Sequence, residues 1–160
     1  MDSVAQMHKD GLTGCYSRYA LEYDLTIDLH TLSRKSQRYR QSFLFVDVEN
    51  MQRYLDFHGY GPADAALIEL GRRLRLHYPT LGEYRYGGDK FVVVGADVFH
   101  LGISEKLPVA IKHAIVRADI GVVDGRHHRA ASWLLLHIHE GIVKASIRGA
   151  LIVCQDRTDA

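Results

Sequence analysis

The stretch that decides the fold is Tyr84-Arg85-Tyr86-Gly87-Gly88-Asp89-Lys90-Phe91-Val92-Val93-Val94, two short apolar runs joined by a Gly-Gly pair and a carboxylate. Adjacent glycines permit positive φ at both central positions of a tight turn, the geometry of a hairpin between right-twisted strands. The stretch therefore predicts a β-hairpin over 84–94 with Asp89 at its exposed tip. A carboxylate at such a tip can join a second acid in holding a divalent metal.

The second acid ends a buried strand. Residues 43–48, Phe-Leu-Phe-Val-Asp-Val, are apolar apart from Asp47 and are followed by Glu49 and Asn50. A helical pattern comes next, so we expect Asp47 at the carboxyl end of the strand. Ligands of open α/β sheets collect at that edge. Asp47 and Asp89 are therefore the candidate metal ligands.

The rest of the chain alternates between helical and strand patterns. A leucine stripe at Leu21, Leu25, Leu29 and Leu32 predicts a core-facing helix over 17–37. A β-branched run favours a buried strand over 112–123. Pro62 suits the first turn of a helix. The remaining expected elements are helices over 51–57, 63–76 and 132–145 and a strand over 150–154.

The composition of the 160-residue chain excludes several classes of function. This length suits one domain over residues 1–160. Lysine and arginine number 20 against 19 acidic residues, so the net charge of +1 favours neither nucleic-acid polymers nor direct membrane insertion. Cys15 and Cys154 lack zinc or redox spacing. Neither a spanning segment nor a signal pattern is found, so we expect a cytoplasmic chain. A membrane or sensor segment elsewhere in the gene product is compatible with this.

Four groups of residues are informative together: Gly87-Gly88-Asp89-Lys90-Phe91, the run from Asp10 to Arg18, Asp47-Val48-Glu49, and Asp56 with Gly59 and Asp64. Together they resemble the GGDEF domain, the diguanylate cyclase family. The resemblance covers about 8–153. It implies an α/β fold of the α+β type, with a palm-like, ferredoxin-related sheet that contains antiparallel strands and is flanked by helices. It also implies a place in a larger multidomain signalling protein. The matching residues are Gly87-Gly88-Asp89-Lys90-Phe91 for the signature, Asp10 to Arg18 for the opening D-x-L-T-G-L-x-N-R, Asp47-Val48-Glu49 for D-x-D, and Asp56, Gly59 and Asp64 for N-D-x-x-G-H-x-x-G-D.

The resemblance also implies a chemistry. Diguanylate cyclases join two GTP molecules into cyclic di-GMP with loss of pyrophosphate, and two domains must face each other because each binds one GTP. By position, Asp47, Asp89 and the backbone of Val48 would hold Mg²⁺, with Asp89 and Lys90 at the catalytic positions. Asp64, Asp56, Asn50, Gly87 and Gly88 would contact the nucleotide. Without the metal role, Asp47 and Asp89 are a solvated strand end and a turn former.

The first departure from the family is Lys90, which stands where the signature has Glu. A unit charge pair about 4 Å apart interacts by roughly 1 kcal/mol in water and roughly 4 kcal/mol at an effective dielectric of 20. Lys90 would therefore weaken Mg²⁺ binding by roughly one to three orders of magnitude, and by less if its side chain points away. The alternative is that Lys90 contacts phosphate itself and partly replaces the metal.

Further departures concern the base and the phosphates. Leu55 takes the place of the base-reading Asn, where a lost polar partner costs roughly 1 to 3 kcal/mol, and we interpret it as an apolar core position. The two phosphate-binding cations of the family are missing from their aligned places in 145–151. Lys144 and Arg148 lie nearby, but a helix turns by about 100° per residue, so neither is expected to substitute for them. Residues 78–81 lack the product-inhibition motif. The chain is also short by about one helix between Phe91 and Gly121, so either a sheet face is exposed or 101–107 covers it compactly.

These losses predict a degenerate, catalytically inactive GGDEF domain. It would serve as a regulatory, nucleotide-binding or interaction module in bacterial cyclic di-GMP signalling, with GTP or cyclic di-GMP as ligand. Its partner would be a second copy in a homodimer, or an adjacent EAL or sensor domain. Two alternatives stay open: a weakly active cyclase that uses Asp47 and Asp89, and a nucleotide-free dimerisation scaffold.

Overall fold

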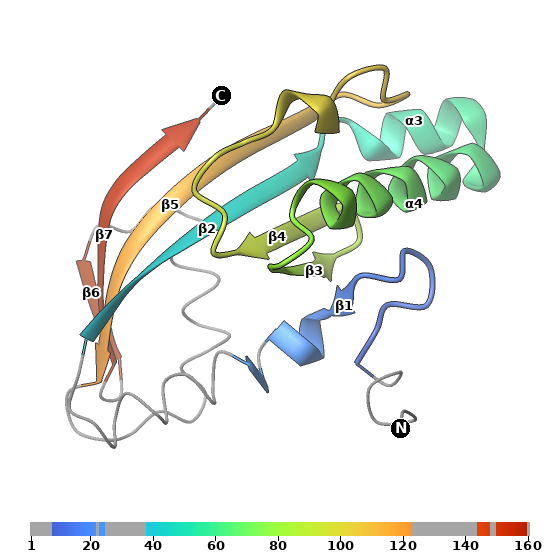
Figure 1. Ribbon diagram of the computed structural model, residues 1–160. Coiled ribbons are helices and arrows are strands. Elements are labelled where there is room, and N and C mark those ends of the chain that lie inside the picture. The colour runs from blue at the N-terminus through green and yellow to red at the C-terminus, as the bar shows by residue number, and fades with distance from the viewer. Residues whose placement is uncertain (1–7, 22, 25–37, 123–143, 148–149, 160) are drawn as a thin grey trace.

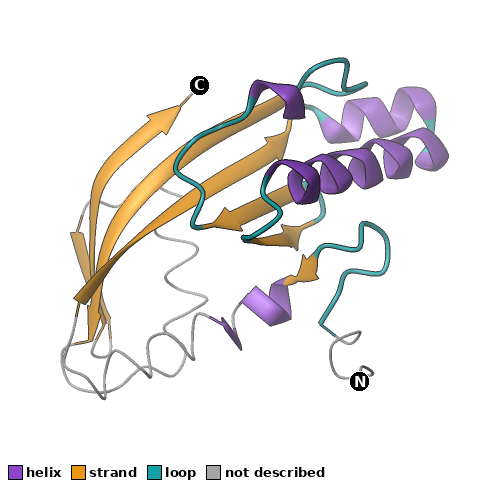
Figure 2. Ribbon diagram, viewed as in Figure 1, coloured by secondary structure: helices purple, strands orange, loops and turns teal. Residues whose placement is uncertain are grey.

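The computed structural model describes residues 8–21, 23–24, 38–122, 144–147 and 150–159. The elements are β1 (Tyr16–Ser17), β2 (Arg38–Val48), α3 (Met51–His58), α4 (Tyr60–His77), β3 (Gly82–Gly87), β4 (Lys90–Val94), the 3₁₀ turn η1 (Leu101–Ile103), β5 (Ile111–Val122), β6 (Lys144–Ile147) and β7 (Ala150–Asp159). Within the described residues, seven strands form one mixed sheet in the order β1-β3-β4-β2-β5-β7-β6, and helices α3 and α4 lie beside it (Figures 1 and 2). Only β1 and β3 pair in parallel among these strands. This arrangement confirms the expected α+β fold.

The predicted hairpin is confirmed, but its turn geometry is not. Strands β3 and β4 pair antiparallel up to Gly87 and Lys90, which leaves Gly88 and Asp89 in the turn. Neither glycine has positive φ; the described glycines that do are Gly14, Gly59 and Gly95. The register shifts between Arg85 and Gly87. Such a bulge adds local twist to the strand, so a turn with positive φ is not needed to match the strands.

The central elements match the predicted ones closely. Strand β2 begins at Arg38 rather than at 43, because it pairs with β5 along its whole length, from Arg38 opposite Gly121 to Val48 opposite Ile111. Helix α3 ends one residue beyond the prediction, and α4 begins at Tyr60, which places Pro62 in its first turn.

The elements predicted near the two ends of the chain agree with the structure only in part. Residues 18–21 and 23–24 are helical, and the rest of the helix expected over 17–37 lies outside the described residues. Most of the helix expected over 132–145 also lies outside them. Its predicted end is wrong, because Lys144 and Ala145 belong to β6, which pairs with β7. Strand β7 continues to Asp159 instead of ending at 154, since it pairs with β5 as far as Ala114.

The core explains why β2 is apolar on both faces. Leu44 and Val46 are fully buried on the side of α4, whereas Phe43 and Phe45 alternate with them and are buried on the other side. The rings of Phe43 and Phe45 stack with centroids 6.2 Å apart. The cluster on the α4 side includes Ala66, Leu67, Leu70, Leu74, Phe91, Val93, Ile103, Val109 and Ile115.

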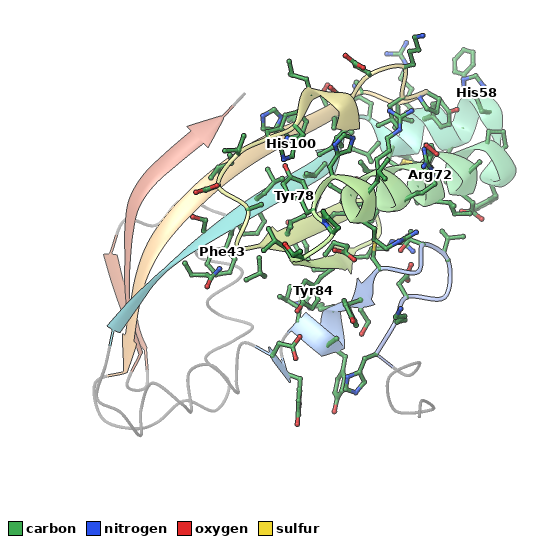
Figure 3. The ribbon with its side chains drawn as sticks, in the orientation of Figure 1. Phe43, His58, Arg72, Tyr78, Tyr84 and His100 are labelled. Carbon is green, nitrogen blue, oxygen red and sulfur yellow. The ribbon has the colours of Figure 1, made fainter. Side chains whose placement is uncertain are left out.

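The segment between β4 and β5 covers part of this core. Ile103 in η1 is fully buried, and Val109 is 7% exposed. Arg73 of α4 donates to the carbonyl oxygens of Ile103 and Glu105, which fastens the segment to the helix. Figure 3 shows His100 of this segment beside Tyr78, and the centroids of their rings lie 5.0 Å apart. The compact covering expected as one alternative for 101–107 is therefore present.

The described part of the chain holds no membrane-spanning helix. None of its helices combines the length and the apolar character that crossing a bilayer requires.

Two leucines of α4 provide a test of this core. Leu70 is fully buried and Leu76 is 63% exposed. We expect Leu70→Ala to lower the free energy of unfolding by about 2–5 kcal/mol, because it leaves a cavity against β2. Leu76→Ala should change it by less than about 0.5 kcal/mol. Urea denaturation of both variants measures this, and equal losses would contradict the packing described.

Candidate functional site

The hairpin tip, the end of β2 and the start of β5 meet at one edge of the sheet. Asp47 lies opposite Lys90 of β4 on one side and opposite Lys112 of β5 on the other. The backbone N–H of Val48 donates to the carbonyl oxygen of Asp89 at 3.0 Å. The sequence-predicted residues Asp47, Val48, Asp89 and Lys90 are therefore brought together.

The side chain of Lys90 points into this group. Its Nζ lies 3.5 Å from Asp89 Oδ1 and 3.8 Å from Asp47 Oδ2, and its side chain is 40% exposed. The other arrangement considered from the sequence, with Lys90 turned away, is not observed. Because all three side chains are partly exposed, each pairing is worth on the order of 1 kcal/mol or less.

The pKa of Tyr86 is raised in the neighbourhood of the two carboxylates. Burial raises the pKa of its phenol, and the negative charges of Asp47 and Asp89 raise it further. Its ring meets that of Phe45 edge-on, with centroids 6.0 Å apart. The phenol therefore stays neutral at physiological pH and closes the apolar side of the site.

A polar cavity of about 300 Å³ opens beside the carboxylates. Asn50 on its wall has φ 52° and ψ 40°, and it ends the connection from β2 at the start of α3. We call this space the lysine cavity. It is lined by Asp47, Val48, Glu49, Asn50, Lys90 and Lys112.

A larger pocket of about 430 Å³ lies between α3, α4 and the hairpin tip. Leu55 lines it, so the expectation that this residue packs in the core is wrong. Its side chain is half-buried and faces the pocket between α3 and α4 instead of the core cluster. We call this space the Leu55 pocket. It is lined by Met51, Gln52, Leu55, Tyr60, Ala63, Asp64, Leu67, Arg85, Gly88 and Asp89.

The other predicted nucleotide contacts separate into two groups. Asp64 and Gly88 line the Leu55 pocket. Asp56 does not: it is exposed and accepts a hydrogen bond from Gln52 Nε2 at 2.9 Å. Gly87 is needed for packing, since a Cβ there would lie 3.3 Å from that of Lys90.

Comparison with known proteins identifies the family. A family model described as "Diguanylate cyclase, GGDEF domain" matches residues 7–143. The chain belongs to the GGDEF family.

A curated relative matches part of the chain, and solved GGDEF structures share its fold. An uncharacterized signaling protein of Caulobacter vibrioides is 31% identical over 87 residues, 53% of this chain but only 10% of the relative. The GGDEF domain of DgcB from Caulobacter crescentus, solved with c-di-GMP, has a TM-score of 0.56 at 13% identity, covering 84% of this chain and 89% of that one. The S helix-GGDEF-EAL part of Vibrio cholerae LapD, bound to c-di-GMP, gives a TM-score of 0.53 at 12% identity, covering 71% and 29%. At these identities the two structures show the fold alone.

The contacts that hold the signature hairpin of this GGDEF domain in place were not predicted from the sequence. Arg85 donates through Nη1 to both carboxylate oxygens of Asp10, at 3.2 and 3.1 Å, and through Nε and Nη2 to the carbonyl oxygen of Gly88. Asp10 in turn accepts hydrogen bonds from the N–H and hydroxyl of Thr13. The turn at Asp10 could have been predicted, because an Asp followed three residues later by Thr is typical of a turn capped by a side chain. The contact of Asp10 with Arg85 could not have been predicted from this local pattern.

A divalent metal does not fit the GGDEF site in this arrangement. The ammonium of Lys90 lies within 4 Å of both carboxylates that would be the ligands. A metal bound between Asp47 and Asp89 would have to displace Lys90 and then work against its charge.

Removing the charge of Lys90 tests this conclusion. We expect Lys90→Met to strengthen Mn²⁺ or Mg²⁺ binding by roughly 5-fold or more, since roughly 1 kcal/mol of charge repulsion is removed. Lys90→Arg keeps the charge and should leave the affinity within about twofold of the original. Isothermal calorimetry measures both. An equal gain in both variants would show that the charge is not the cause.

The clamp between Asp10 and Arg85 predicts a pH dependence. Burial raises the pKa of Asp10, but the hydrogen bonds from Thr13 and the charge of Arg85 outweigh it, so the pKa lies below its ordinary value. The stabilisation is therefore present above the unfolded pKa of about 3.9 and is lost as the pH falls through the lower folded value. Asp10→Asn should cost about 1–2 kcal/mol of unfolding free energy at pH 7, and the cost should shrink below about pH 4.

Urea denaturation at several pH values measures this difference. Asp56→Asn, at an exposed position, is the control and should change little at any pH. A cost for Asp10→Asn that stays constant down to acid pH would contradict the charged clamp.

Proposed function

We propose that this GGDEF domain is a catalytically inactive regulatory module of bacterial cyclic di-GMP signalling. The observation that carries the proposal is the position of the Lys90 ammonium, 3.5 and 3.8 Å from the carboxylates of Asp89 and Asp47. In the family reaction, bound metal supplies the positive charge that stabilises the phosphoryl oxygens during transfer. Here the side chain of Lys90 is already paired with both carboxylates, which leaves them poorly suited to hold that metal.

The Leu55 pocket supports a loss of efficient GTP use. A base in this pocket would meet the carboxylate of Asp64 and the apolar side chain of Leu55. Leu55 offers neither a donor nor an acceptor, so base selectivity in this pocket falls by roughly 1 to 3 kcal/mol for the missing partner. Tight selection of GTP through this pocket is therefore not expected.

The regulatory role follows from what the fold relatives do. One is a GGDEF domain solved in complex with c-di-GMP, and another is a chain that joins a GGDEF domain to an EAL domain and is bound to c-di-GMP. We extend this to a cytoplasmic module that senses GTP or cyclic di-GMP and passes the signal to an adjacent EAL or sensor domain or to a second copy in a homodimer.

A weakly active cyclase is the second candidate. Asp47 and Asp89 are both retained, and both converge on one cation. If Lys90 turned to a phosphate of GTP, the two carboxylates would become available to Mg²⁺.

Product analysis combined with thermal unfolding distinguishes the candidates. We expect the chain, incubated with GTP and Mg²⁺, to yield no cyclic di-GMP by mass spectrometry, and its stability to rise with GTP or cyclic di-GMP. A ligand present at a hundred times its Kd raises the free energy of unfolding by about 2.7 kcal/mol. Cyclic di-GMP that forms in the original chain and disappears in Asp89→Ala would establish the cyclase. Neither product nor stabilisation would leave the nucleotide-free scaffold.

A further inference from the structure

A second pocket of about 370 Å³ lies on a different face of α3 from the Leu55 pocket. Residues 53, 54, 57 and 58 line it, whereas residues 51, 52 and 55 line the Leu55 pocket, and a helix turns by about 100° per residue. We call it the α3 groove. Its lining includes Glu49, Arg53, Tyr54, Phe57, His58 and Val109.

The α3 groove presents flat rings above an apolar floor. The ring centroids of Tyr54 and His58 lie 4.4 Å apart, and those of Phe57 and His58 lie 6.0 Å apart. Figure 3 shows His58 at the outer end of α3. Phe57 is 79% exposed, whereas Val109, which lines the same groove, is 7% exposed. Rings arranged in this way favour stacking with a planar ligand.

Two opposite charges line the same groove without pairing. Glu49 and Arg53 both face it, yet neither side chain has a hydrogen bond or an ion pair within the part of the chain that the structure describes. The backbone N–H of Glu49 donates to the carbonyl oxygen of Ala110 at 2.8 Å, which fixes the corner of the groove. A carboxylate and a guanidinium held apart suit a ligand whose edge carries both donors and acceptors.

The groove continues into the lysine cavity, because Glu49 and Asn50 line both. Lys112 on the wall of that cavity is exposed, and its ammonium has no ion pair with any described residue. An anionic group attached to a planar ring in the groove can therefore reach a free positive charge.

We propose that the α3 groove binds a guanine nucleotide without a metal. Guanine offers N–H donors at N1 and N2, which Glu49 accepts, and acceptors at O6 and N7, which Arg53 reaches. The base stacks on Tyr54 and His58, and the 5′-phosphate pairs with Lys112. Adenine presents a donor where guanine has O6, so Arg53 opposes it. This site goes beyond the proposed regulatory function and does not depend on it.

Calorimetric titration with GMP, guanosine and AMP in EDTA tests the proposal, since EDTA excludes metal and turnover. We expect Glu49→Gln and Arg53→Gln each to weaken GMP binding at least 10-fold, and AMP to bind the original chain at least 10-fold more weakly than GMP. Lys112→Met should weaken GMP but leave guanosine unchanged. Arg72→Gln, at an exposed position of α4 that lines neither the α3 groove nor the Leu55 pocket, is the control and should leave GMP affinity within about twofold.

Three results would overturn the proposal. One is loss of GMP binding in Asp64→Asn with retention in Glu49→Gln, which would place the base in the Leu55 pocket. Another is equal affinity for AMP and GMP. The third is no GMP binding at millimolar concentration. Thermal unfolding of each variant shows that it is folded. A failure here is separate from failure of the proposed function, which is decided by cyclic di-GMP production from GTP with Mg²⁺.

Discussion

The ammonium of Lys90 lies within 4 Å of the carboxylates of Asp47 and Asp89, and this pairing decides the electrostatics of the sheet edge. Asp47 ends β2, and Asp89 is in the β3–β4 turn. Two negative charges brought this close repel each other unless a cation lies between them. A metal serves that purpose in many phosphoryl-transfer sites. Here the chain provides the cation itself, from the residue that follows Asp89.

Contacts elsewhere in the fold fix the backbone positions of Asp47 and of the hairpin tip that carries Asp89. Strand β2 is buried on both faces and pairs on both sides, so Asp47 cannot move without disturbing the core. The hairpin tip is held by Arg85, which joins the Gly88 carbonyl oxygen to the carboxylate of Asp10. Helix α3 then separates two pockets of different character. The Leu55 pocket has lost a polar partner for a base, whereas the α3 groove carries rings and two unpaired charges.

Local sequence patterns predicted most of the central elements and the meeting of Asp47 with Asp89. The hairpin, α3 and β5 follow from apolar periodicity and turn residues, which act over a few neighbours. The rest depends on contacts between distant residues. A β-bulge removed the need for positive φ at the glycines, and pairing of β6 with β7 gave Lys144 and Ala145 a strand conformation. The contact of Arg85 with Asp10, and the orientations of Lys90 and Leu55, exist only once the sheet and α3 have assembled.

The most direct measurement is a crystal structure of the chain grown with millimolar Mn²⁺ and analysed for anomalous scattering. The decisive feature is which positive charge lies between Asp47 and Asp89. We expect the Lys90 ammonium within about 4 Å of both carboxylates, as in a salt bridge, and no anomalous peak between them. A Mn²⁺ peak bound by Asp47 and Asp89, with Lys90 displaced into solvent, would contradict the central claim that this GGDEF domain supplies its own cation.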